Sequence, residues 1–143
     1  MRNIITTITT ALALSAASAI TAQAQEVKVI VNAANSISEL PAGEITGLFL
    51  KRTQKFPGGG AAVPVDQAKN SAVRATFSRT LLGRPASAVD SYWQQQIFAG
   101  GELPPAVKAS DDDVIAFVKA TPGAIGYVSA GATISGVKVV TVK

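Results

Sequence analysis

A short polar segment between an apolar run and a helical pattern carries the residues best suited to hold an anion. In VDQAKNSAVR, residues 65–74, Lys69 supplies a positive charge, Asn70 an amide and Ser71 a hydroxyl. The first N–H groups of a helix lack partners within it, and α/β proteins hold anions at such helix starts, after the carboxyl ends of strands. Asn70 or Ser71 could equally act as an ordinary N-cap in a protein that binds nothing, and the sequence leaves both interpretations open.

Two other clusters have simpler structural explanations. The three aspartates at 111–113 could attract a hard cation, but acidic residues at a helix start stabilise the helix dipole and consecutive side chains point in different directions. The three glycines at 58–60 lie near lysines, yet they lack P-loop spacing, which favours a surface loop. We therefore expect no metal site at the aspartates and no phosphate-binding loop at the glycines.

Composition narrows the classes of function. The chain has no cysteine and no histidine, which excludes disulfides, thiol nucleophiles, histidine-based triads and histidine-ligated metals. No spacing nominates paired carboxylates or a Ser–Lys pair, so we expect no enzyme, no catalytic residue and no cofactor. The net charge of +4 is mild and spread along the chain, unlike the dense basic stripe of nucleic-acid binders. A small anion is the expected partner, and nucleic acid is not.

The first 24 residues are typical of a secretory signal peptide. Arg2 precedes an uncharged run, and Ala22 and Ala24 fit the small-x-small rule for cleavage. An uncleaved anchor helix is the alternative, but the run is rich in Thr and Ser and only marginally long enough to span a membrane. We predict a signal peptide over residues 1–24 and one exported, periplasmic domain over residues 25–143.

Apolar periodicity divides residues 25–143 into strands separated by helices, which predicts an α/β sandwich with a mixed sheet of about four or five strands. The expected strands cover residues 26–32, 61–65, 124–128 and 137–142, and the expected helices begin near residues 41, 70, 85 and 110. Residues 102–110 contain two prolines and are predicted to be an irregular connector.

The helical patterns also predict which side chains face the core. In the helix that begins near residue 70, Phe77 faces inward and Arg74 lies on another face. In the next helix Val89, Trp93 and Ile97 share the inward spacing. Trp93 is therefore predicted to be core rather than a platform for stacking.

Four segments occur in a recognisable order: EITGLFLKRTQKFPGG, VPVDQAKNSAVRATFSRTLLG, YWQQQIFAGG and TPGAIGYVSAG. Together they resemble the substrate-binding proteins of phosphate ABC transporters, which have the type 2 periplasmic binding protein fold. The resemblance covers essentially all of residues 25–143 and implies a single-lobe α/β sandwich of that type, whereas full-length members have two lobes. It also implies that the strand of TPGAIGY is scaffold beneath the ligand cleft.

The resemblance further implies a ligand site at the second helix. Aligned through that helix, the family's phosphate loop, Arg-Ser-Asp-Gly-Ser-Gly-Thr, places the ligand-binding residues at Gln67, Lys69, Asn70, Ser71, Ala72 and Val73. Ser71 matches the second serine, but Gln67 stands in place of the arginine, Ala72 of the glycine and Val73 of the threonine. Losing the arginine removes a bidentate clamp, so backbone amides become the main donors.

Two functions of different classes fit these residues. One is an exported solute-binding protein for phosphate or a similar small oxyanion, working with the membrane part of an ABC transporter. The other is a periplasmic interaction module that keeps the fold, binds no ligand and docks onto an envelope protein. The sequence leaves open whether two copies form a homodimer.

The signal-peptide prediction can be tested on protein purified from the periplasm. We expect the intact mass to correspond to a chain that begins at Gln25 or within a few residues of it. A mass that still includes residues 1–24 would contradict the predicted export.

Overall fold

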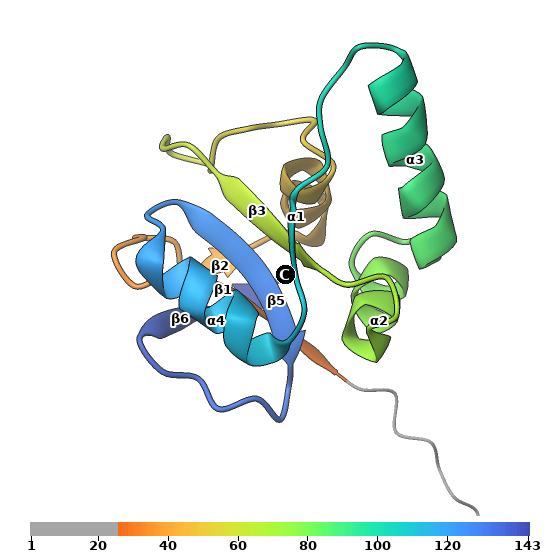
Figure 1. Ribbon diagram of the computed structural model, residues 1–143. Coiled ribbons are helices and arrows are strands. Elements are labelled where there is room, and N and C mark those ends of the chain that lie inside the picture. The colour runs from red at the N-terminus through yellow and green to blue at the C-terminus, as the bar shows by residue number, and fades with distance from the viewer. Residues whose placement is uncertain (1–25) are drawn as a thin grey trace, which may run out of the picture.

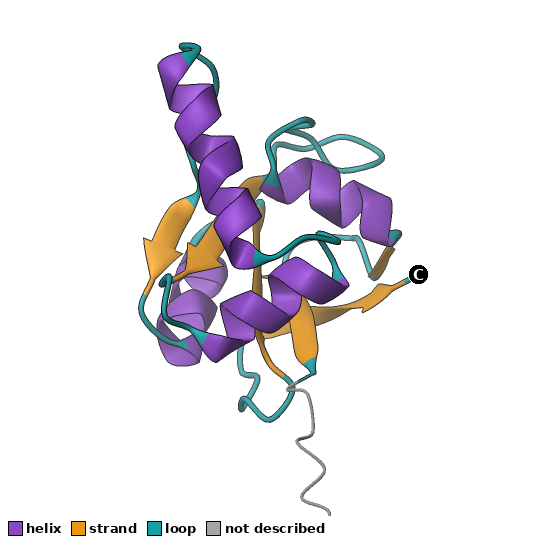
Figure 2. Ribbon diagram, turned by 90° about the vertical axis from the view of Figure 1, so that its right-hand side faces the viewer, coloured by secondary structure: helices purple, strands orange, loops and turns teal. Residues whose placement is uncertain are grey.

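A computed structural model describes residues 26–143 (Figures 1 and 2), so the predicted signal peptide lies outside the described residues. The elements are β1 (Val27–Asn32), β2 (Glu39–Leu40), α1 (Ala42–Phe49), β3 (Val63–Gln67), α2 (Ala72–Thr80), α3 (Ala86–Phe98), β4 (Ala106–Lys108), α4 (Asp111–Ala120), β5 (Ala124–Ser129) and β6 (Val137–Val142). Within residues 26–143, no helix combines the length and apolarity needed to cross a membrane.

The strands form one mixed sheet in the order β2-β6-β1-β5-β3-β4. Strand β1 runs antiparallel to β5 and β6, whereas β3 runs parallel to both β5 and β4. The predicted α/β class with a mixed sheet is confirmed, but the sheet has six strands rather than four or five. The two unpredicted strands, β2 and β4, are only two and three residues long and lie at the sheet edges.

Strand β4 corrects the prediction that residues 102–110 form an irregular connector. Its three residues follow Pro104 and Pro105 directly and pair with β3 from Val65 to Gln67. A proline cannot donate to a ladder, so the pairing begins only after the second one. Three residues are too few to show an alternating hydrophobic pattern. The segment is a strand because it pairs with β3.

Helices cover both faces of the sheet (Figure 1). Because side chains alternate along a strand, neighbouring residues of β1 enter different cores. Val31 belongs to the larger core, which α1, α2 and α3 cover, and Ile30 belongs to the smaller core beneath α4. In β5, Tyr127 and Val128 divide between the same two cores.

Strand β5 has small residues because α4 and β3 approach it closely. A side chain at Gly126 would place its Cβ 2.7 Å from Val65 and 2.8 Å from Val114. Gly123, at the start of the strand, has φ +80°, and a Cβ there would lie 2.4 Å from the carbonyl oxygen of Ala61. Both positions therefore require glycine, which supports the scaffold role predicted for TPGAIGY.

Helix α3 is buried only in part. Val89 and Trp93 are buried as predicted, with Trp93 5% exposed, but the prediction for Ile97 is wrong because its side chain is 52% exposed. The carboxyl end of α3 projects beyond the sheet in both views (Figures 1 and 2). Ile97 lies in that last turn and does not belong to the core. A residue at an inward-facing helical position is therefore not buried there.

Candidate functional site

The candidate site lies where β3 ends and α2 begins, at residues 67–73, which we call the α2 mouth. A tight turn connects the two elements, with the Ser71 N–H donating to the Ala68 carbonyl at 2.9 Å. Ser71 is the N-cap of α2, because its hydroxyl oxygen accepts the Arg74 N–H at 3.2 Å. The predicted helix start is therefore confirmed, and Ser71 rather than Asn70 caps it.

The Ser71 hydroxyl donates a hydrogen bond to another side chain of the protein. It goes to Oε1 of Gln67 at 2.9 Å, and Gln67 is only 3% exposed. Nε2 of Gln67 donates to the Tyr127 carbonyl at 3.0 Å and to a carboxylate oxygen of Asp111 at 2.9 Å. Both Nε2 partners are acceptors only, which fixes the amide with its oxygen towards Ser71.

Asp111 links α4 to this side of the sheet. Besides Gln67, its carboxylate accepts the hydroxyl of Ser129 at 2.6 Å and the N–H of the same residue at 3.3 Å. Because these bonds engage both carboxylate oxygens, Asp111 acts as a structural anchor between α4, β3 and β5. Among residues 26–143, no group of three or more acidic side chains is arranged to hold a metal ion.

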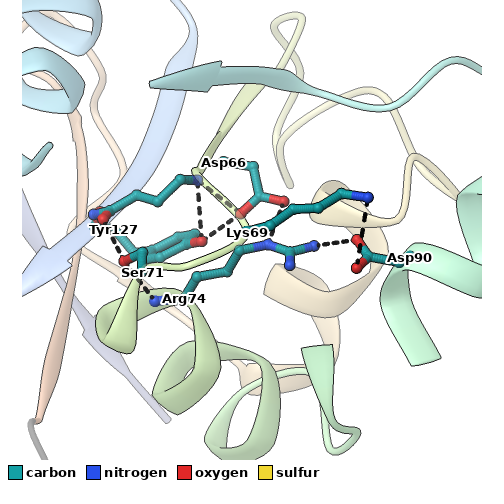
Figure 3. A network of polar contacts seen from close by, with 7 residues as sticks. Asp66, Lys69, Ser71, Arg74, Asp90 and Tyr127 are labelled. Atoms are coloured by element: carbon teal, nitrogen blue, oxygen red, sulfur yellow. Dashed lines mark hydrogen bonds and ion pairs between the residues drawn. The ribbon is translucent and has the colours of Figure 1, made fainter. Parts of the chain in front are cut away.

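Arg74 is the residue that the sequence prediction misplaced. The prediction placed Arg74 on a face of α2 other than the core-facing one, but its side chain is only 5% exposed and lies between two carboxylates (Figure 3). Nε donates to Asp66 at 3.3 Å, and a terminal nitrogen donates to Asp90 at 2.8 Å. A charge buried this deeply needs such partners. Burial alone would lower the pKa of Arg74, but Asp66 and Asp90 outweigh it and the pKa is raised.

Asp66 is also the partner of a buried tyrosine. One of its carboxylate oxygens accepts the Tyr127 hydroxyl and the Gln67 N–H, the latter at 2.8 Å. The Tyr127 ring is stacked on Phe77 of α2, with centroids 3.8 Å apart and planes 7° from parallel. Burial of the phenol, reinforced by the negative charge of Asp66, raises the pKa of Tyr127 well above its usual value.

Asp66, Gln67, Ser71, Arg74, Asp90 and Tyr127 therefore form one set of connected side chains, which we call the Arg74 network (Figure 3). The sequence prediction included Gln67 and Ser71 but missed the charged members. One signal was present: Asp66 directly follows the strand predicted over residues 61–65, and a basic residue, Arg74, lies in the first turn of the next helix. The second carboxylate, Asp90, comes from a helix whose placement the sequence does not give.

Of the remaining predicted site residues, all but Val73 are exposed, and Val73 packs against the larger core. Lys69, Asn70 and Ala72 are exposed and Val73 is half-buried. Lys69 is 80% exposed, and its ammonium lies 4.0 Å from the second carboxylate oxygen of Asp90. The N–H groups of Ala72 and Val73 have no hydrogen-bond partner within residues 26–143. The groups that the α2 mouth offers to a ligand are thus the two free N–H groups of Ala72 and Val73 and the exposed ammonium of Lys69.

The glycine loop at residues 58–60 lies away from the α2 mouth. It precedes the amino end of β3, whereas the α2 mouth follows the carboxyl end of the same strand. All three glycines have positive φ, from 87° to 105°. The loop closes on itself through hydrogen bonds between the backbones of Phe56 and Gly59 and of Phe56 and Gly60, both at 3.0 Å.

Comparison with known proteins places the fold. Neither a family model nor a curated protein matches the sequence. Solved structures do match: an ABC-type phosphate transport receptor from Vibrio cholerae is 17% identical with a TM-score of 0.63, and PstS from Borrelia burgdorferi is 16% identical with a TM-score of 0.64. A Clostridium perfringens protein solved with bound phosphate, described as a phosphate ABC transporter substrate-binding protein, is 18% identical with a TM-score of 0.59.

These structures establish the fold and show how much of each chain shares it. The matches cover 82–83% of this chain but only 45–47% of the other chains, so this chain spans less than half their length. The fold is therefore that of part of a phosphate-binding protein, as the resemblance implies. At such identities the likeness extends to the fold and to no single residue of the α2 mouth.

The Tyr127 phenol gives a prediction for stability at alkaline pH. Its pKa is raised in the folded protein, so ionisation favours unfolding once the pH exceeds the ordinary tyrosine value of 10.0. Above that pH we expect the unfolding free energy of the parent to fall by about 1.4 kcal/mol per pH unit relative to a Tyr127→Phe variant. Urea unfolding of both proteins between neutral pH and pH ~11 measures this difference. Parallel profiles would contradict the burial of an un-ionised phenol against Asp66.

Proposed function

We propose that this protein is an exported solute-binding protein that holds phosphate or a similar small oxyanion at the α2 mouth. The observation that carries the proposal is the pair of free N–H groups of Ala72 and Val73 beside Lys69, in a fold shared with phosphate-binding proteins. Partnerless amides at a helix start favour an anion through both hydrogen bonds and the helix dipole. The ligand would then lie outside the Arg74 network, which supports it from beneath.

The same geometry sets a limit on affinity. Gln67 occupies the position that the resemblance assigns to an arginine, and its amide is committed to Tyr127 and Asp111. Among residues 26–143 the only buried guanidinium is that of Arg74, and it is paired with Asp66 and Asp90. Without a free bidentate clamp, the proposed site holds its anion more weakly than an arginine-clamped one.

An interaction module that binds no ligand is the second candidate, and one observation favours it. The hydroxyl of Ser71, the amide of Gln67 and the guanidinium of Arg74 all find partners inside the protein. A site built this way is complete without a ligand. The protein would then keep the fold as a platform for an envelope partner.

The remaining aspects of the proposal follow from the class of protein. The neighbours are described as transport receptors and substrate-binding proteins, which supports a role in transport rather than catalysis. We infer that the domain works in the periplasm after removal of residues 1–24. Its partner there would be the membrane part of an ABC transporter.

Lys69 offers the cleanest test of the proposed site, because its side chain is 80% exposed and its ion pair with the Arg74 network, to Asp90, is long at 4.0 Å. We expect calorimetry to detect binding of phosphate or sulfate to the parent. Removing one charge-assisted hydrogen bond in Lys69→Gln should weaken that binding by about tenfold. The titrations are made at one fixed ionic strength, since screening changes the contribution of an exposed charge.

Lys55→Gln is the matched control, because it removes an exposed lysine beside the glycine loop at residues 58–60. Its affinity should equal that of the parent. A loss in Lys55→Gln but not in Lys69→Gln would move the site to the glycine loop. If neither oxyanion binds the parent, solute binding is wrong and the interaction module remains.

A further inference from the structure

A pocket of about 220 Å³ lies beside the α2 mouth, between α3 and the segment that leads into β4. One wall is a single face of α3 formed by Asp90, Trp93, Gln94 and Ile97, which follow one another at helical spacing. The opposite wall contains Pro104, Pro105 and Val107, and the polar floor belongs to the Arg74 network. The pocket is therefore a slot with mainly apolar walls and charged groups at its base, and Asp90 and Lys69 also belong to its lining.

Exposed apolar side chains gather on the surface around this slot. Among residues 26–143, the four most exposed large apolar side chains all belong to the end of α3, the following segment and β4. Phe98 is 92% exposed, Leu103 64%, Val107 59% and Ile97 52%. Ile97 and Phe98 belong to the last turn of α3, and the carboxyl end of this helix projects beyond the sheet (Figures 1 and 2). Scattered apolar residues are normal on a surface, but a contiguous group marks an interaction site.

We propose that this surface binds a second copy of the same chain, with Phe98 of each copy entering the slot of the other. Phe98 directly follows Ile97, which lines the slot, so a protruding ring and an apolar recess lie side by side on one surface. Such a surface is self-complementary and suits a two-fold dimer, in which each contact occurs twice. The two-fold axis then passes close to Ile97.

Area and charge agree with a second copy as the occupant. A phenylalanine buries about 150–250 Å², so Phe98 alone supplies roughly a quarter of the ~800 Å² that each partner contributes to a standard interface. The rim carries both signs of charge, because the ammonium of Lys69 lies 4.0 Å from the carboxylate of Asp90 and both residues line the slot. Two copies brought together through this surface therefore face balanced charge, and the arrangement of apolar centre and polar rim is that of a protein interface.

Sedimentation over a concentration series tests the proposal on the purified protein. We expect a reversible monomer–dimer equilibrium in the parent and a dissociation constant raised by at least about tenfold in Phe98→Asp. Gln95→Asp places the same charge on an exposed position of the same helix outside the slot, and it should dimerise like the parent. A monomeric parent at every concentration, or equal association of Phe98→Asp and the parent, would overturn the proposal.

The absence of native cysteine allows an independent measurement on the same surface. Because the axis passes close to Ile97, two copies of Ile97→Cys should form a disulfide under mild oxidation, which requires Cα atoms less than about 7 Å apart. Gln95→Cys serves as the control and should cross-link far more slowly. Equal rates in the two variants would show random collision rather than a defined dimer and would overturn the proposed arrangement.

Discussion

Arg74 belongs to helix α2, and its guanidinium links this helix to strand β3 and to helix α3. Its two carboxylate partners come from the end of β3 and from the middle of α3, at 3.3 and 2.8 Å. A buried cation without partners would be strongly destabilising, so the position of α2 against the sheet and against α3 is fixed by this one group. Tyr127 and Gln67 extend the same constraint to β5 through Asp66.

This constraint also shapes what the α2 mouth can bind. Asp66 and Asp90 already neutralise the Arg74 guanidinium, so it attracts a ligand only weakly. The Ser71 hydroxyl already donates its hydrogen bond to Gln67. In the proposed function, the anion is therefore held by the first amides of the helix and by the exposed Lys69. The Arg74 network is satisfied without a ligand, and the proposed anion site lies on its outer side.

The sequence predicts the helices and strands whose boundaries are set by residues close to them in the chain. Helix α2 begins where Ser71 can cap it, and β5 was identified from an apolar run between glycine and serine. Strand β4 was missed because three residues carry no pattern, and its pairing with β3 is decided by tertiary structure. The predicted burial of Ile97 failed for a related reason, since helical spacing does not reveal where the sheet beneath a helix ends.

The candidate site shows the same division. Ser71 follows from its position at a strand–helix junction and Gln67 from the family resemblance. The role of Arg74 depends on Asp90, sixteen residues away on another helix. A hydrophobic pattern assigns a charged residue to the outside by default. Only the three-dimensional arrangement shows that two carboxylates make its burial favourable.

A double-mutant cycle between Arg74 and Asp66 in phosphate-free buffer tests the central claim most directly. Urea unfolding of the parent, Arg74→Met, Asp66→Asn and the double variant can be followed through Trp93, the only tryptophan in the chain. If the ion pair holds α2 on the sheet without a ligand, Arg74→Met alone should cost about 3–5 kcal/mol and the coupling between the two substitutions should reach about 2–3 kcal/mol. A coupling below about 0.5 kcal/mol would mean that the two residues act independently and that the fold does not depend on their interaction.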